Sequence, residues 1–241
     1  MGTRNSNWFP ATRMRETENM ENPEVYARIG SLRIVPVIAI DNPDDALTLA
    51  DALLEGGLPI AEITFRTTAA ARVIETIAGQ RPGILLGAGT LLNPEDLRRA
   101  VECGAVFGVA PGFNPEIVRE AIKIRFPFSP GVMTPSDIEG ALALGIQVLK
   151  FFPAGAAGGV KMLRSIAAPY AHLGVRFIPT GGVNLNNMRE YLEEKSVLAL
   201  GGTWIATRED IAAARWKTIR DNCRAALAVV EELKATAPAS L

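Results

Sequence analysis

Eight short apolar runs recur along the chain from about residue 34 onward, and a longer amphipathic stretch separates each run from the next. The runs are RIVPVIAI, IAEITF, ILLGAG, AVFGVA, FPFSP, QVLKFF, VRFIPT and SVLALG. This alternation is typical of repeated βα units that build a parallel sheet. Eight repeats favour an α/β fold of the (β/α)8 (TIM) barrel type over an open doubly wound sheet, and no G-x-G-x-x-G fingerprint follows a strand.

Four of the amphipathic stretches carry the start signals of helices. They are NPDDALTLADALLEGG, NPEDLRRAVECG, NPEIVREAIK and TPSDIEGALALG. Each begins with Asn or Thr, which cap a helix, followed by Pro, which suits the first helical position, and acidic residues lie in the first turn. Three of them run to a glycine suited to the helix end. These stretches therefore predict helices between the strands.

The chain of 241 residues has the length of a single-domain α/β barrel. We expect a flexible leader over residues 1–20 and a barrel domain over residues 21–241. Val25, Ile29 and Leu32 recur at helical spacing, which predicts a short helix that closes the lower end of the barrel. A last amphipathic helix is predicted over residues 209–235.

Composition excludes several classes of function. Twenty-five basic and 26 acidic residues leave a formal charge of −1, which is unlike a nucleic-acid-binding surface or a polybasic membrane anchor. The chain has no secretory signal pattern and no apolar run of about 18 residues, so a cytoplasmic protein is predicted. Cys103, Cys223 and the single histidine, His172, fit no common zinc spacing, and we expect reduced thiols and no metal.

Polar residues at the carboxyl ends of barrel strands are the first candidates for chemistry. In the second run, Glu62, Thr64 and Arg66 alternate with apolar residues and so share one face, which we expect to point into the barrel. An arginine there suits a substrate carboxylate, and a partly desolvated carboxylate suits proton transfer. A plain ion pair between Glu62 and Arg66 is the competing interpretation.

Lys150 lies in the apolar sixth run and shares a face with Val148 and Phe152. Burial disfavours a charged ammonium because the charge loses its hydration, and an uncharged amine is a nucleophile. A Schiff base with a ketone needs such an amine, an acid-base partner and a polar clamp, which Lys150, Glu62 and Arg66 supply. The alternative is an inert buried ion pair between Lys150 and Glu62.

Double glycines end the seventh and eighth runs, at Gly181 and Gly182 and at Gly201 and Gly202, and Thr203 follows the second pair. Barrels often bind phosphate after these two strands, because glycine lets backbone N–H groups approach an anion closely. The sequence therefore predicts a phosphorylated substrate. Thr90 and Pro111 end the third and fourth runs, where a hydroxyl group and a pocket wall are expected.

Seven motifs in this order resemble the bacterial KDPG/KHG aldolases, a family of class I enzymes that act on 2-dehydro-3-deoxy-phosphogluconate and 4-hydroxy-2-oxoglutarate. They are AEITFRT, GAGTLLNPEDL, APGFN, SPGVMTPSDI, LKFFPAGAAGGVK, PTGGVN and ALGGTW, and the match runs from about residue 25 to about residue 230. The resemblance implies a homotrimer that needs no cofactor. It also implies a role for each candidate: the Schiff base for Lys150, acid-base chemistry for Glu62, the substrate carboxylate for Arg66 and Thr90, the pocket for Pro111 and Phe152, and the phosphate for Gly181, Gly182, Gly202 and Thr203.

The reaction implied is the reversible cleavage of the phosphorylated ketoacid to pyruvate and glyceraldehyde 3-phosphate. Relatives that act on the galactonate epimer tend to lack the arginine at the place of Arg66, which favours the gluconate substrate. Two further interpretations stay open. One is a phosphosugar isomerase or epimerase with Glu62 as base and Lys150 as electrostatic support, and the other is a barrel without catalysis that binds a phosphorylated metabolite.

Overall fold

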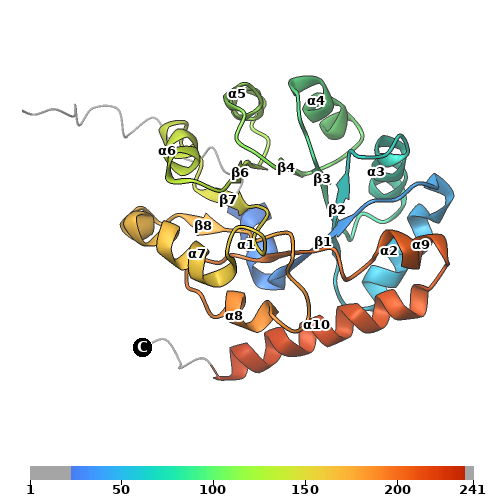
Figure 1. Cartoon of the computed structure of the whole chain (residues 1–241). Coiled ribbons are helices and arrows are strands. Elements are labelled where there is room, and N and C mark those ends of the chain that lie inside the picture. The colour runs from blue at the N-terminus through green and yellow to red at the C-terminus, as the bar shows by residue number, and fades with distance from the viewer. Residues whose placement is uncertain (1–22, 237–241) are drawn as a thin grey trace, which may run out of the picture.

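A computed structural model describes residues 23–236, and the leader expected over residues 1–20 lies outside them. The strands surround a common axis and the helices form an outer ring (Figure 1). The strands are β1 Ile34–Ile38, β2 Ile60–Thr64, β3 Leu85–Gly89, β4 Phe107–Val109, β5 Phe128–Ser129, β6 Gly131–Val132, β7 Val148–Phe151, β8 Arg176–Phe177 and β9 Leu200–Gly202.

The parallel strands close into a barrel. One sheet has the order β5-β4-β3-β2-β1-β9, and a second has the order β6-β7-β8. β5 and β6 flank Pro130, which has no backbone N–H, so they are two halves of one barrel strand. Bridges from Phe177 to Val197 and from Thr180 to Gly201 join β8 to the segment that carries β9. The predicted (β/α)8 barrel is confirmed, with β5 and β6 counted as its fifth strand.

The helices follow the strands in the order that the sequence predicts. They are α1 Pro23–Leu32, α2 Ala46–Glu55, α3 Ala70–Gln80, α4 Pro94–Glu102, α5 Pro115–Lys123, α6 Pro135–Ala143, α7 Gly159–Ala167, α8 Met188–Leu192, α9 Arg208–Ala212 and α10 Trp216–Thr236, with short 3-10 helices at η1 Pro43–Asp45 and η2 Ala168–Leu173.

Helix capping follows the sequence signals. The side chains of Asn93 and Asn114 accept hydrogen bonds from backbone N–H groups in the first turns of α4 and α5. Thr134 and Asp137 form a capping box at α6. Burial raises the pKa of Asp137, but hydrogen bonds from the Met133 backbone and from the backbone and hydroxyl of Thr134 outweigh it and hold the pKa below its usual range.

Helix α1 packs across one end of the barrel. It contacts β1, and the hydroxyl of Tyr26 lies 3.1 Å from that of Ser129 in β5, on the opposite side of the barrel. Figure 1 accordingly shows α1 at the centre of the ring of helices. Val25 and Ile29 of this helix are buried in the core.

The prediction of one final helix over residues 209–235 is wrong. The chain forms α9 and α10 instead, separated by a turn in which Ala214 has a φ of 51°. The backbone N–H of Arg215 bonds to the carbonyl of Asp210, which ends α9. The residue type alanine does not indicate a left-handed backbone conformation, and it does not interrupt the amphipathic pattern, so the break is not apparent from the sequence. Among residues 23–236, no helix has the length and apolarity needed to cross a membrane.

Candidate active site

Lys150 and Glu62 meet inside the barrel. Nζ of Lys150 in β7 lies 3.0 Å from Oε1 and 3.4 Å from Oε2 of Glu62 in β2. The two residues are 5% and 3% exposed, and they are the only charged residues among the buried part of the described chain. Burying a pair of charges is costly unless each charge is satisfied by the other. Loss of either Lys150 or Glu62 would therefore leave an unpaired charge inside the barrel.

A glycine in the neighbouring strand makes room for the carboxylate. Glu62 is the register partner of Gly87 in β3, and the next inward position of that strand is Gly89. A Cβ atom on Gly89 would lie 2.0 Å from Oε1 of Glu62. The absence of a side chain at Gly89 therefore leaves the space that the Glu62 carboxylate occupies.

Arg66 lies at the rim of the barrel. The sequence places it inside with Glu62 and Thr64, but β2 ends at Thr64 and Arg66 follows in a turn where it is exposed. Its Nε donates to Oγ1 of Thr64 at 3.2 Å, and the Thr64 hydroxyl donates in turn to the carbonyl of Ile38 at 3.0 Å. This short relay fixes the guanidinium above the barrel mouth and leaves its terminal nitrogens available to a ligand.

Phe152 connects Lys150 to the first double-glycine turn. Nζ of Lys150 lies 5.8 Å from the centroid of the Phe152 ring. A Cβ atom on Gly181 would lie 3.1 Å from the same ring. Gly181 and Gly182 have φ values of 87° and 79°, which residues with side chains rarely adopt, so the turn requires glycine. The predicted pocket wall and the predicted phosphate turn are therefore neighbours.

Pro111 packs against the strand next to Lys150. Gly131, the register partner of Lys150, is so close to Pro111 that a Cβ atom on Gly131 would lie 2.1 Å from the Pro111 carbonyl oxygen. Thr90 follows β3 with a φ of 59°. A β-branched residue in the left-handed region is strained, and such strain occurs preferentially at functional sites.

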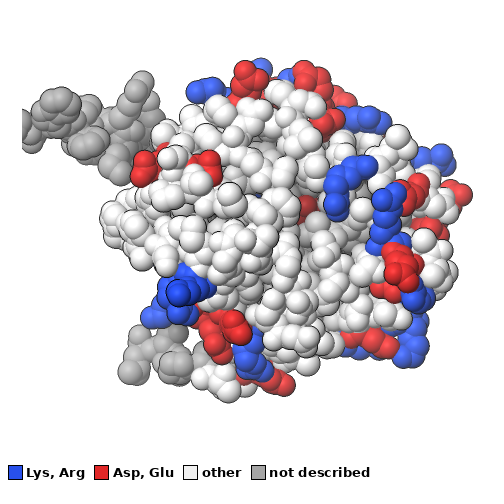
Figure 2. All heavy atoms as spheres, viewed as in Figure 1, with Lys and Arg blue, Asp and Glu red and all other residues white. Residues whose placement is uncertain are grey.

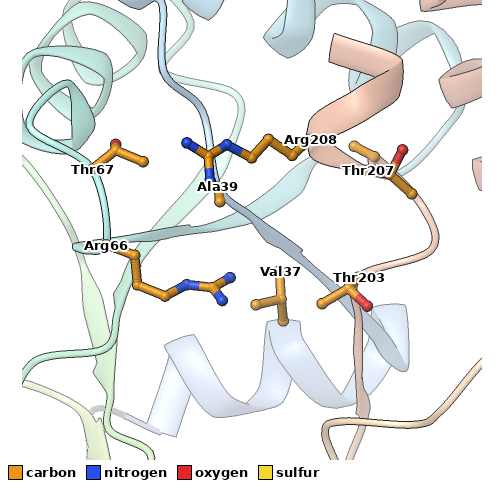
Figure 3. A pocket seen from close by; sticks show the side chains of 8 residues that line it. Val37, Ala39, Arg66, Thr67, Thr203, Thr207 and Arg208 are labelled. Atoms are coloured by element: carbon orange, nitrogen blue, oxygen red, sulfur yellow. The ribbon is translucent and has the colours of Figure 1, made fainter. Parts of the chain in front are cut away.

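A cavity of about 370 Å³ opens beside this centre, between the ends of β1, β2 and β9 (Figure 3). Its lining includes Val37, the register partner of Glu62, together with Arg66 and Thr203. Gly202 directly precedes Thr203 and pairs with Pro36 of β1. The volume is in the range of sites for small ligands. The remaining lining residues are Ala39, Thr67, Ala206, Thr207 and Arg208.

Arg208 is a residue of this site that the sequence did not indicate. Its guanidinium bonds to both carboxylate oxygens of Asp41, which follows β1. The Arg208 hydrogen bonds hold the pKa of the Asp41 carboxyl below its usual range. The two residues lie far apart in the chain and neither belongs to a local motif, so only the closed barrel reveals that they meet.

Charge is unevenly distributed over the face that carries the barrel mouth. Figure 2 shows few charged side chains over the centre of this face, and basic side chains beside it in the region between α3 and α9. Among the described residues there is no group of three or more His, Cys, Asp or Glu side chains that could hold a metal ion. The arrangement thus offers a buried amine, a buried carboxylate and basic groups at the rim for anions.

Comparison with known proteins identifies relatives of the whole barrel. The model of the family "KDPG and KHG aldolase" matches residues 25–222. The 2-dehydro-3-deoxy-phosphogluconate aldolase of Haemophilus influenzae is 46% identical over 81% of this chain and 92% of its own length. For the KHG/KDPG aldolase of Escherichia coli K12 the identity is 39%, over 80% of this chain and 90% of its own.

A solved structure agrees with these matches. The KDPG aldolase of Legionella pneumophila, with pyruvate captured at low pH as a covalent carbinolamine intermediate, superposes with a TM-score of 0.80 at 38% identity. The match covers 84% of this chain and 97% of that one. The family model spans most of the barrel, and the relatives match over nearly their whole length. The chain therefore belongs to the KDPG and KHG aldolase family, whose members are carbon–carbon lyases.

Proposed function

We propose that this protein is a class I aldolase that cleaves 2-dehydro-3-deoxy-6-phosphogluconate to pyruvate and glyceraldehyde 3-phosphate. The same site would cleave 4-hydroxy-2-oxoglutarate to pyruvate and glyoxylate. The observation that carries the proposal is the 3.0 Å contact between Nζ of Lys150 and Oε1 of Glu62 inside the barrel. The relatives in Haemophilus influenzae and Escherichia coli, named for these activities, support it.

Lys150 opens the reaction. Glu62 accepts a proton from the ammonium group, because its carboxylate already lies within hydrogen-bond distance. The free amine attacks the C2 carbonyl of the substrate and forms a carbinolamine. Glu62 returns the proton to the carbinolamine hydroxyl, water leaves, and an iminium remains on Lys150. The iminium withdraws electrons from the C3–C4 bond and so makes its cleavage easier.

Glu62 also serves the cleavage step. Its carboxylate takes the proton of the C4 hydroxyl, the electrons of the C3–C4 bond move toward the iminium nitrogen, and the aldehyde leaves. The enamine of pyruvate that remains takes a proton at C3, and water then hydrolyses the iminium to release pyruvate and the free amine. One carboxylate thus acts as base and acid in turn.

The other residues bind the ends of the substrate. Arg66 and Thr90 hold the pyruvate carboxylate in this proposal, since the exposed guanidinium is fixed through Thr64 at the rim. Pro111 and Phe152 form the walls, and Phe152 lies close to Nζ of Lys150. The phosphate binds in this proposal through backbone N–H groups of the glycines at the two double-glycine segments, together with the hydroxyl of Thr203. Those glycines are Gly181 and Gly182, which follow the seventh strand of the barrel, β8, and Gly202, the last residue of β9.

We also propose a homotrimer. Its support is the exposure of large apolar side chains in loops at strand ends, of which Leu92 is 56% and Met133 43% exposed. Sedimentation velocity of the full chain tests it, and a single species with the mass of one chain contradicts it. Residence in the cytoplasm stays a prediction of the sequence.

The experiment that tests the function is a measurement of pyruvate release, coupled to lactate dehydrogenase. The phosphorylated gluconate, its galactonate epimer and hydroxy-oxoglutarate are compared at equal enzyme concentration. We expect the highest kcat/KM on the gluconate substrate. Pyruvate release fastest from the galactonate epimer would reassign the substrate. Isomerisation or ligand binding without any pyruvate would favour the isomerase or the non-catalytic barrel.

A further inference from the structure

The cavity at the barrel mouth carries two guanidinium groups. Arg66 enters it from the turn after β2, and Arg208 enters it from the first turn of α9 (Figure 3). The proposed substrate has an anionic group at each end, a carboxylate and a phosphate. The proposed function assigns Arg66 to the carboxylate, so Arg208 is a cation of the same cavity with no assigned partner in the substrate.

Arg208 is held in a defined orientation. Its Nε bonds to Oδ2 of Asp41 and its Nη2 bonds to Oδ1, in the two-point geometry that matches a guanidinium to a carboxylate. A guanidinium has five N–H donors, and this pairing occupies two of them. The other three, including both on Nη1, are available to a ligand in the cavity.

The remaining lining identifies where an anion would sit. The hydroxyl of Thr207 is bonded to Asp210, and that of Thr67 donates to the carbonyl of Ile40. Thr203 is exposed in the cavity and follows Gly202 directly. Arg208 and Thr203 therefore offer polar groups to the same space, beside Gly202, one of the residues proposed to receive the phosphate.

We propose that Arg208 binds the phosphate of the substrate and that Asp41 positions it, so that Arg208 determines the preference for phosphorylated ketoacids. This inference rests on the proposed function and adds a residue to it. Arg208 binds through its N–H donors and its charge, whereas Thr203 and the glycine turns bind through neutral groups. Loss of the arginine is therefore expected to weaken phosphate binding without removing the amine chemistry at Lys150.

The test compares two reactions of the same enzyme. Cleavage of the phosphorylated gluconate uses the phosphate site, whereas exchange of the methyl hydrogens of pyruvate in D2O, followed by NMR, proceeds through the enamine without any phosphate. In Arg208→Gln, the ratio of kcat/KM for cleavage to the exchange rate should fall about tenfold, through KM, as expected for one lost charge-assisted hydrogen bond at a partly exposed site. Arg208→Lys should keep part of this ratio.

Arg189→Gln is the matched control, because Arg189 forms an exposed ion pair with Glu232 between α8 and α10. This variant should keep the wild-type ratio. Inorganic phosphate, used as a competitive inhibitor of cleavage, should bind more weakly to Arg208→Gln than to the wild type and equally to the control. An unchanged ratio with unchanged phosphate inhibition in Arg208→Gln would overturn the proposal.

Asp41→Asn tests whether Asp41 orients Arg208 or only repels the phosphate through its negative charge. If Asp41 orients Arg208, its loss should raise KM for the phosphorylated substrate, although less than the loss of Arg208 itself. A lower KM, as expected if the carboxylate only repels the phosphate, would overturn the positioning role. Wild-type protein that forms no pyruvate at all would count against the proposed function, whereas an active wild type with an unaffected Arg208→Gln counts against this inference alone.

Discussion

Gly89 in β3 faces the Glu62 carboxylate in β2 at a place that has no room for a side chain on residue 89. A Cβ atom on Gly89 would lie 2.0 Å from Oε1 and 2.7 Å from Cδ of Glu62. Both distances are well below van der Waals contact, so the carboxylate has its place next to Lys150 only because residue 89 has no side chain. The position of the proposed acid-base group thus depends on a glycine in the neighbouring strand.

Gly89→Ala should therefore impair catalysis. The added methyl group displaces the Glu62 carboxylate from Lys150, and kcat for pyruvate release should fall by about 10²-fold or more, the typical contribution of acid-base catalysis. Steady-state kinetics measure the loss, and circular dichroism verifies that the barrel is folded. Gly79→Ala is the matched control, since nothing lies within 4 Å of its added Cβ atom in α3. A kcat for Gly89→Ala equal to that of this control would contradict the steric argument.

Glu62→Gln should greatly reduce turnover but still allow slow formation of the iminium on Lys150. The amide has nearly the shape of the carboxylate but accepts no proton, so we expect kcat to fall by about 10²–10⁴-fold. Incubation with pyruvate and borohydride for hours instead of seconds should still give the covalent adduct on Lys150. Turnover near the wild-type rate would show that another group transfers the proton.

Arg66→Lys should weaken binding of the ketoacid more than it slows the chemistry. Lysine keeps the charge but cannot present the planar pair of donors that matches a carboxylate, and it loses the bond from Nε to Thr64. We expect KM to rise roughly tenfold, from the loss of about one charge-assisted hydrogen bond. Arg72→Lys, at an exposed position of α3, serves as control. A reduced kcat at unchanged KM would contradict a binding role.

The two cysteines should differ in reactivity. Burial raises the pKa of the Cys223 thiol to about 12, and burial also raises the pKa of Cys103, which is only partly covered. The thiolate is the reactive form and becomes scarcer as the pKa rises above the pH. Iodoacetamide at pH 8 should therefore label Cys103 slowly and Cys223 only after unfolding, as peptide mass spectrometry can show. Equal labelling of both in the folded protein would contradict the packing of Cys223 against Gly56.

Local signals predicted much of the fold. Asn93, Asn114 and Thr134 cap their helices as the Asn-Pro and Thr-Pro pairs indicate, because capping depends on residues within one turn. Alternation along strands likewise predicted that Lys150 and Glu62 face the interior, since successive side chains of a strand point to opposite sides.

The misses share a physical cause. Alternation holds only while a strand continues, and β2 ends before Arg66, which is exposed instead of enclosed. The break between α9 and α10 depends on the left-handed backbone of Ala214. The pairing of Asp41 with Arg208 joins the loop after the first strand to the helix after the last strand. Such features depend on where a strand ends, on the backbone conformation of one residue and on the closure of the barrel. None of these can be predicted from the types of the residues involved.

In the proposed mechanism, Lys150 is the amine that bonds to the ketoacid. The most direct measurement is reduction with borohydride in the presence of pyruvate, followed by peptide mass spectrometry of the active protein. We expect a mass increase that corresponds to reduced pyruvate on Lys150 and none on the exposed Lys161 of α7, with parallel loss of activity. Active protein that retains an unmodified Lys150 after this treatment would contradict it.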